Sequence, residues 1–240
     1  MDVTVLVSSW DGWDVLWPPF AYAWTKHWPD CPWPTLFITN VKEAPLGTIA
    51  TGEDTNWTHM TRTALGAVTS PTVLFIHDDC WLTRRVDTRT VLDFAGIVER
   101  KEAEHVRFYR SAQGDQGGMG SYDPDPRLYR VDPAFPYYLN LQAAFWNREA
   151  MLALLYGDET CWQFETTGSG RGRQMGMRAL CVDAATTPDQ YDGMAYMCYI
   201  NAVAQGRWRL TVRGSTVLGD RVIDSSDAPP SLWHALRIGR

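Results

Sequence analysis

The sequence lacks the features that mark several protein classes. Its 240 residues include no apolar stretch of roughly 18 residues and no basic leader, so neither a membrane-spanning segment nor a secretory signal is predicted. The 5 cysteines are widely spaced and form no C-x-x-C pair, which disfavours a disulfide framework or a zinc site. The 5 histidines show no H-x-x-x-H or H-E-x-x-H spacing. We therefore expect a soluble, cytoplasmic protein with reduced thiols.

A surplus of basic residues is also missing. Lys and Arg total 22 against 28 Asp and Glu, giving a net charge of −6, the opposite of the usual footprint of a nucleic-acid binder. Extended binding to a phosphate backbone is therefore not favoured, although the arginines of 171–178 and 207–213 could form a local groove. The composition, 45% hydrophobic and 21% charged, is that of an ordinary globular domain.

What the sequence does contain is an apolar run, residues 72–76, that ends in His77-Asp78-Asp79. Such a run is typical of a buried strand, and carboxylates at its carboxyl end lie where open α/β sheets bind ligands. Adjacent carboxylates suit Mg²⁺ or Mn²⁺, which takes one or two of them together with substrate phosphate oxygens. The alternative is a turn with a helix cap, which two aspartates also serve well.

The order of predicted elements favours an α/β fold with a mostly parallel, Rossmann-like sheet flanked by helices. Strands are predicted at 3–7, 34–40, 72–76 and 106–109, and helices at 17–27, 56–68 and 86–104. The alternation breaks beyond residue 110, which predicts an irregular second half. That half is predicted to contain a glycine-rich loop at 113–121, a strand at 137–146, a helix at 147–156, a flexible basic loop at 168–173 and a strand at 208–213.

Short motifs occur in order along these elements. They are SSWD at 8–11, WPPF at 17–20, HWPD at 27–30, FITN at 37–40, GED at 52–54, HDD at 77–79, LQAAFW at 141–146, WQFE at 162–165 and GRW at 206–208. Together they resemble GT-A type glycosyltransferases of bacteria and phages, of the kind associated with capsular and surface polysaccharide synthesis. Cys80 follows the two aspartates, so a strict Asp-x-Asp motif is absent.

The resemblance implies one GT-A domain over 1–240, with a nucleotide-sugar-binding half at 1–110 and an acceptor-binding half at 111–240. The expected donor is a nucleotide-diphospho-sugar, a UDP-sugar first, with Mn²⁺ or Mg²⁺ bound by Asp79 and assisted by Asp78. The candidate donor-binding residues are Ser8, Asp11, Asn40, Asp54, Arg62, Asp78, Asp79 and Arg171. Each has an ordinary structural alternative, as a turn residue, a strand end or a solvated helix face.

The second half has to supply the acceptor side. Glu165 is the candidate general base for a direct, inverting displacement, since such a step needs a carboxylate near the acceptor hydroxyl. Trp162 and Phe164 could shield that carboxylate and raise its pKa, or they could be core residues. Gln142, Trp146 and Trp162 are the acceptor-binding candidates. The expected acceptor is a glycan or a hydroxymethylated base of phage DNA.

Two other functions remain open on the sequence. One is a non-catalytic nucleotide-sugar or carbohydrate-binding module. The other is a metal-dependent nucleotidyltransferase, which also places aspartates at a strand end. That class usually adds a third carboxylate and a basic phosphate-binding segment near the N-terminus, whereas the segment after the first predicted strand here is acidic and aromatic.

Overall fold

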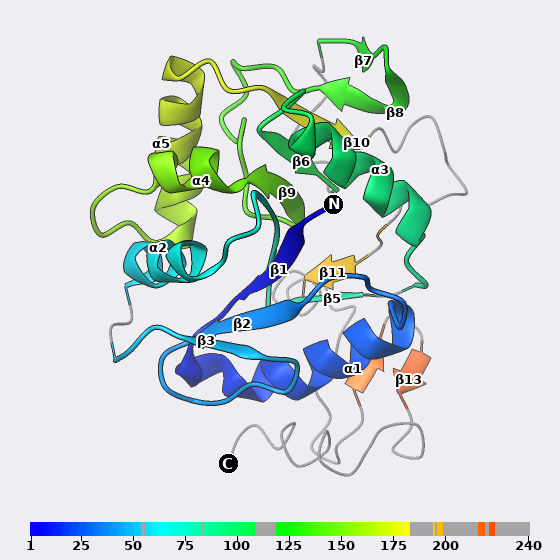
Figure 1. The fold of residues 1–240 in the computed structure, drawn as a ribbon. Coiled ribbons are helices and arrows are strands. Elements are labelled where there is room, and N and C mark those ends of the chain that lie inside the picture. The colour runs from blue at the N-terminus through cyan, green and yellow to red at the C-terminus, as the bar shows by residue number, and fades with distance from the viewer. Residues whose placement is uncertain are drawn as a thin grey trace.

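The structure, a computed structural model, describes residues 1–53, 56–82, 84–108, 119–182, 194, 196–198, 216–218 and 221–223. A nine-stranded mixed sheet with the order β3-β2-β1-β4-β9-β6-β10-β8-β7 forms its centre (Figure 1). Its strands are β1 (Val3–Ser8), β2 (Thr35–Thr39), β3 (Thr48–Ala50), β4 (Thr72–His77), β6 (His105–Arg107), β7 (Ser121–Tyr122), β8 (Asp125–Arg130), β9 (Ala144–Asn147) and β10 (Ala179–Val182). The helices are the 3-10 helix η1 (Asp11–Leu16), α1 (Trp17–His27), α2 (Trp57–Ala67), α3 (Thr88–Glu99), α4 (Arg148–Leu154) and α5 (Cys161–Gln174). Two small sheets pair β5 (Cys80–Leu82) with β11 (Tyr196–Cys198), and β12 (Thr216–Leu218) with β13 (Arg221–Ile223).

The parallel part of the sheet is built around β1. Strands β2 and β4 both run parallel to it, and β6 and β10 run in the same direction further along the sheet. Side chains of β1 alternate between the faces, with Val5 and Val7 in one core cluster and Leu6 in the other. Every residue of β1 is buried, which explains why this strand is continuously apolar or small. The predicted Rossmann-like α/β architecture is confirmed.

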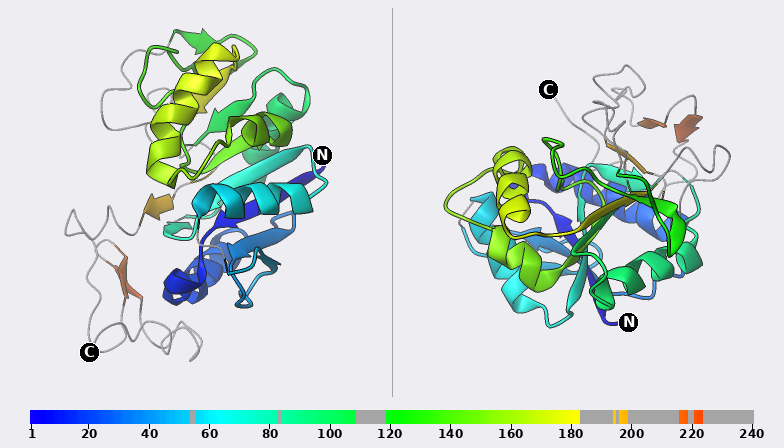
Figure 2. Two further views of the ribbon diagram at one scale, coloured as in Figure 1. Left: turned by 90° about the vertical axis from the view of Figure 1, so that its left-hand side faces the viewer. Right: turned by 90° about the horizontal axis from the view of Figure 1, so that it is seen from above.

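Helices cover both faces of the sheet. Helices α1 and α3 lie on one face, and α2, α4 and α5 on the other (Figures 1 and 2). Helix α1 begins with prolines in its first turn, where the missing N–H is not needed, and its aromatic side chains form a seam against β2. Phe20 packs edge-on to Phe37 and stacks on Trp24.

Capping side chains set the helix starts. Asn56, Asp87 and Asn147 each accept a hydrogen bond from the backbone N–H three residues ahead, and Thr160 forms a capping box with Gln163. The helix predicted at 17–27 is confirmed, as are helices close to 56–68 and 147–156. The helix predicted at 86–104 is shorter, because Asp87 caps its start and Lys101 adopts a positive φ of 58° just beyond its end.

Two predictions for the second half are wrong. The strand predicted at 137–146 is only β9, which runs antiparallel between β4 and β6. The basic loop predicted at 168–173 is the body of helix α5. Two of its glycines serve close packing: a Cβ on Gly172 would collide with the Leu139 side chain, and one on Gly168 would lie 3.1 Å from the Phe164 ring.

Several sequence expectations lie outside the described residues: Asp54, most of the loop predicted at 113–121, and the strand predicted at 208–213. Within the described part of the chain, no helix has the length and apolar character needed to cross a membrane.

The close packing of α5 predicts opposite effects for two alanine substitutions in one helix. For Gly170→Ala we expect stabilisation of up to about 1 kcal/mol, because alanine favours helix and the new Cβ would meet only the Arg173 guanidinium at 3.9 Å. For Gly172→Ala we expect a net loss of about 1–2 kcal/mol, because buried Leu139 has to move. Urea denaturation of both variants measures this, and equal stabilisation by both would contradict the packing argument.

Candidate functional site

The carboxyl edge of the parallel strands gathers the polar residues singled out in the sequence. Ser8 ends β1 and is in register with Ile38 of β2 and His77 of β4, so Asn40 and Asp78 follow at the same edge. Ligands of open α/β sheets bind outside this edge. Because β9 runs in the opposite direction, its beginning lies at the same edge, and Gln142 immediately precedes it.

A chain of hydrogen bonds fixes Asp78. The Trp17 indole N–H donates to Ser9 Oγ at 2.6 Å, and the Ser9 hydroxyl donates to Asp78 Oδ2 at 2.5 Å. The Asp78 carbonyl also accepts from the Trp81 indole at 2.9 Å. Burial raises the pKa of the Asp78 carboxyl to about 8, an effect that the Ser9 bond opposes and the Asp79 charge reinforces. Asp78 is 8% exposed, so it is a poorly solvated acid tied to the loop after β1.

Asp79 is the more accessible of the two acids, being half-buried. Its Oδ1 accepts a weak hydrogen bond from the Cys80 thiol at 3.6 Å. The strand β5 begins at Cys80, so the acidic pair occupies the tight connection between β4 and β5.

Asp11 and Asn40 lock two loops of this edge together. Asp11 Oδ1 accepts from the Asn40 backbone N–H at 2.9 Å, and Oδ2 accepts from those of Val41 and Lys42, each at 3.1 Å. The Asp11 N–H donates in return to Asn40 Oδ1 at 3.0 Å. Asp11 is one of the candidates for donor contact, and here its carboxylate holds the loop after β2 against η1.

Ser8, the last residue of β1, is buried at the same edge. Its hydroxyl accepts a hydrogen bond from the Trp57 indole at 3.1 Å, which ties β1 to the first turn of α2. The segment after β1 exposes two aromatic side chains: Trp10 is 41% exposed and Trp13 is 40% exposed.

Helix α5 brings Glu165 to this edge from the opposite side. Glu165 Oε1 accepts from the Leu141 backbone N–H at 2.9 Å, and one turn later the Ser169 hydroxyl donates to the Leu139 carbonyl and accepts from the Leu139 N–H, both at 2.9 Å. Burial raises the pKa of the Cys161 thiol to about 11, with smaller contributions from the charges of Glu165 and Asp79. Both carboxylates therefore lie within electrostatic reach of Cys161.

The acceptor candidates are placed differently from one another. Trp162 is 72% exposed on the first turn of α5, and Phe164 is fully buried, so the two do not form the aromatic shelter expected around Glu165. Gln142 is half-buried at the edge. Trp146 is a correction to the sequence expectation: it is fully buried in β9 and packs on His105 with ring centroids 4.2 Å apart, so it presents no surface to an acceptor.

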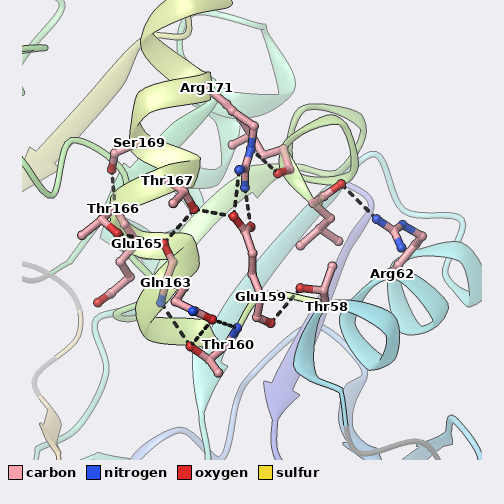
Figure 3. Close-up of polar contacts among 12 residues, drawn as sticks. Thr58, Arg62, Glu159, Thr160, Gln163, Glu165, Thr166, Thr167, Ser169 and Arg171 are labelled. Atoms are coloured by element: carbon pink, nitrogen blue, oxygen red, sulfur yellow. Dashed lines mark hydrogen bonds and ion pairs between the residues drawn. The ribbon is translucent and has the colours of Figure 1, made fainter. Parts of the chain in front are cut away.

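The two arginines proposed for the donor are engaged in structural contacts (Figure 3). Arg171 forms a bidentate ion pair with Glu159, in which Nη1 donates to Oε1 at 2.9 Å and Nη2 donates to Oε2 at 2.6 Å. Its Nε donates to the Leu154 carbonyl. Arg62 donates to the Leu155 carbonyl at 2.9 Å. Figure 3 shows the Glu165 carboxylate pointing away from the Arg171–Glu159 pair.

Some residues at this edge were not identified from the sequence. Ser9 orients Asp78, and its only signal was the Ser8-Ser9 pair after the first strand. Arg107 is fully buried at the end of β6, where it donates to the Tyr137 carbonyl at 2.9 Å. Arg107 stands between Val106 and Phe108 in an otherwise polar stretch, which gives no sequence signal of burial.

The carboxylates of Asp78 and Asp79 fit a divalent cation whose remaining ligands come from a bound substrate. Among the described residues, no group of three or more His, Cys, Asp or Glu side chains could hold an ion alone. Two adjacent carboxylates with no further protein ligands are what Mg²⁺ or Mn²⁺ uses when phosphate oxygens and water complete its shell.

Comparison with known proteins gives no assignment at the level of sequence. No family model matches the chain. No curated protein matches it either.

Solved structures resemble the chain in fold. A CMP:2-keto-3-deoxy-manno-octonic acid synthetase complexed with CTP matches 86% of this chain and 97% of its own, at 10% identity and a TM-score of 0.53. S. aureus TarS 1–349 matches 82% of this chain at 11% identity and a TM-score of 0.49, and this chain covers 59% of it. The mannosyltransferase PcManGT from Pyrobaculum calidifontis, in complex with GDP-Man and Mn²⁺, matches 74% at 14% identity and a TM-score of 0.47, with 53% of its own chain covered.

The topology and the likeness to the synthetase together confirm the predicted Rossmann-like α/β fold. At such identities the likeness concerns the fold alone, and one fold hosts many activities. This chain spans little more than half of the TarS and PcManGT chains, so their activities do not transfer to it as findings.

The buried carboxyl of Asp78 predicts a pH-dependent cost to stability. Between about pH 4 and pH 8 the unfolded chain releases this proton while the folded chain retains it, so stability falls as pH rises through this range. Asp78→Asn keeps a hydrogen-bond acceptor for Ser9 and removes the titration. We expect the variant to be more stable than the parent at pH 8, by an amount on the order of a few kcal/mol, and the difference to shrink toward pH 4.

Chemical denaturation from pH 4 to 8 measures the difference in unfolding free energy between the variant and the parent. EDTA is included to remove bound cations. Asp123→Asn, at an exposed aspartate, is the matched control and should leave the pH profile unchanged. A pH-independent difference between Asp78→Asn and the parent would rule the explanation out.

Proposed function

We propose that the protein is a glycosyltransferase that moves a sugar from a nucleotide-diphospho-sugar, a UDP-sugar first, to an acceptor hydroxyl with inversion. The observation that carries the proposal is the meeting of two groups at one sheet edge: the acidic pair Asp78-Asp79 after β4, and Glu165 with exposed Trp162 on the first half of α5. Sugar transfer by direct displacement needs a place for the leaving diphosphate and a base on the opposite face of the sugar.

On the donor side, residues 1–110 would bind the nucleotide. Asp79, with Asp78 behind it, would hold Mg²⁺ or Mn²⁺, which when bound neutralises charge on the departing diphosphate. Asp78 is suited to a supporting role because Ser9 fixes one of its oxygens and burial disfavours its free anionic state. Asp11 and Asn40 would keep the nucleotide-binding loops in place through their mutual hydrogen bonds.

On the acceptor side, Glu165 would take the proton of the attacking hydroxyl. Its hydrogen bond from Leu141 N–H fixes Oε1 and restricts the carboxylate to one orientation, which favours a positioned base. Trp162 offers an exposed aromatic face, the surface on which sugar rings commonly stack, and Gln142 would contribute a polar contact. The acceptor we propose is a glycan, with a hydroxymethylated base of phage DNA as the other possibility.

One observation favours a second candidate, a metal-dependent nucleotidyltransferase. The synthetase complexed with CTP has a TM-score of 0.53 and is covered over 97% of its length. Against it stands the segment after β1, which contributes acidic and aromatic side chains where a nucleotide triphosphate would need positive charge. The two candidates differ in the ligand they require.

A thermal-shift panel separates these candidates. With Mn²⁺ present, we expect one UDP-, GDP-, CMP- or dTDP-sugar to raise the melting temperature by several degrees, since a ligand at 100 times its Kd adds about 2.7 kcal/mol. Asp79→Asn should weaken the metal-dependent part of the affinity by at least about 10-fold, because a charge-assisted ligand is lost.

Nucleoside triphosphates, CTP and UTP included, belong in the same panel. A shift with a triphosphate and none with any nucleotide-sugar would favour the nucleotidyltransferase. Absence of a shift with every nucleotide would contradict both. Slow hydrolysis of the bound donor would exclude a purely binding module.

Two substitutions at Glu165 separate catalysis from structure. Glu165→Gln retains an oxygen that can accept from Leu141 N–H but removes the base, so we expect near-normal stability and donor binding with transfer reduced about 10²–10⁴-fold. Glu165→Ala loses both functions and should also be less stable by about 1 kcal/mol.

The comparison is made on donor hydrolysis or transfer rate, with melting temperature measured in parallel. Full activity of Glu165→Gln would assign Glu165 a purely positioning role for residues 139–141 and leave the base to be found elsewhere. The matched control is Glu149→Gln, because Glu149 is exposed on α4, remote from the edge.

A further inference from the structure

His77, the last residue of β4, faces the side of the sheet that α2 and α5 cover. It is in parallel register with Ser8, so the two side chains lie on the same face. The Ser8 hydroxyl accepts from the indole of Trp57 on α2, which identifies that face. The His77 ring also lies edge-on to Phe75, with ring centroids 5.9 Å apart, and Phe75 belongs to the core cluster beneath α2, α4 and α5.

Aromatic contacts connect His77 to helix α5. Phe75 packs edge-on to Trp57 with centroids 6.4 Å apart, and Trp57 packs on Phe164 of α5 at 5.2 Å. Phe164 is fully buried and directly precedes Glu165, the candidate base. Helices α2 and α5 lie on the same side of the sheet in both views of the fold (Figures 1 and 2).

The start of β9 lies at the same edge as His77. Ala144 is opposite Phe75 in the antiparallel pair of β9 and β4, so Gln142 and His77 each lie two residues beyond that last pair. Glu165 accepts a hydrogen bond from the backbone N–H of the residue just before Gln142. The edge that carries His77 is therefore also the edge to which Glu165 is fastened.

The two members of the acidic pair differ in the side of the sheet that they serve. Asp78 accepts from the hydroxyl of Ser9, which in turn accepts from α1 on the opposite side. The charge of Asp79 acts on the thiol of Cys161, in the first turn of α5. Asp79 is therefore near the start of α5, on the side that His77 faces.

The imidazole of His77 has the hydrogen-bonding groups that a sugar needs. The residue is half-buried, and none of the residues that the structure describes forms a hydrogen bond with its ring nitrogens. A neutral imidazole has one nitrogen that donates and one that accepts. Sugar hydroxyls also donate and accept, whereas the oxygens of a diphosphate only accept. The chemistry of the ring therefore matches a sugar better than a phosphate.

We propose that His77 binds hydroxyl groups of the transferred sugar, an inference that rests on the proposed function. In a nucleotide-diphospho-sugar that undergoes direct displacement, the sugar lies between the diphosphate and the attacking hydroxyl. Asp79 is assigned to the diphosphate and Glu165 to the attacking hydroxyl, and His77 faces the side of the sheet that both occupy. His77 thus contributes to the choice among donor sugars and leaves the nucleotide to other residues.

The test compares free nucleotides with their sugar conjugates. Isothermal titration calorimetry with Mn²⁺ measures the Kd of UDP, GDP, UDP-glucose, UDP-galactose, UDP-N-acetylglucosamine and GDP-mannose. His77→Phe keeps an aromatic ring against Phe75 but removes both ring nitrogens. We expect it to raise the Kd of the conjugate that binds the parent by about 10-fold, the effect of one or two lost hydrogen bonds, and to change the Kd of the free nucleotide by less than about 2-fold.

Two further variants make the comparison decisive. His77→Gln keeps one donor and one acceptor, so it should recover part of the lost affinity for the conjugate. The matched control is His27→Phe, because His27 is also half-buried but lies in the last turn of α1, and it should change neither Kd. Unchanged binding of the free nucleotide shows that each variant is folded.

The proposal is overturned if the conjugate binds His77→Phe as tightly as the parent. It is also overturned if the free nucleotide and the conjugate weaken equally, since His77 would then contact the diphosphate or its metal. Binding of free nucleotides to the parent with no binding of any conjugate would likewise reject it. If the parent binds none of these probes, the proposed function fails, and the inference about His77 fails with it.

Discussion

The hydrogen-bond chain from Trp17 through Ser9 to Asp78 is the interaction on which the arrangement of the site depends. It joins the loop after β1 to the loop after β4, and it does so through a carboxyl whose neutral state is favoured by burial. A buried acid held by one hydroxyl is costly to ionise, and the adjacent Asp79 charge adds to that cost. The fold therefore keeps a poorly solvated acid at the carboxyl edge of the sheet, where a nearby cation would favour its ionised form.

Helix α5 holds the segment around Leu139 and Leu141 in place on the other side of the edge. Gly172 lets the Leu139 side chain approach the helix closely, and Ser169 and Glu165 form hydrogen bonds with the backbone of Leu139 and Leu141 that replace the strand partner this segment lacks. An irregular segment needs such side-chain hydrogen bonds, because its backbone groups are buried outside any ladder. The same contacts that make α5 structural also bring Glu165 and Trp162 to the edge.

The first half of the fold could be predicted because local signals agree with the tertiary structure. The apolar run 72–76, the prolines at the start of α1 and the Asn56 cap each act within a few residues. The helical state of 168–173 could not be predicted, because three glycines disfavour a helix and the contact of Gly172 with Leu139, which is distant in sequence, is set by tertiary packing. The burial of Trp146 and the ion pair of Arg171 with Glu159 are likewise set by tertiary packing, which residue type alone does not reveal.

The antiparallel strand β9 brings part of the second half of the chain to the carboxyl edge of the parallel strands. A parallel strand between β4 and β6 would bring its end to the carboxyl edge and carry the chain away from it. Because β9 is reversed, it begins at that edge with Ala144 opposite Phe75 of β4, and the segment 139–143 leads into it. Helix α5 then returns to fix this segment through Leu141 N–H. Reversal of a single strand thus brings residues from the second half of the chain to the edge at which β1, β2 and β4 end.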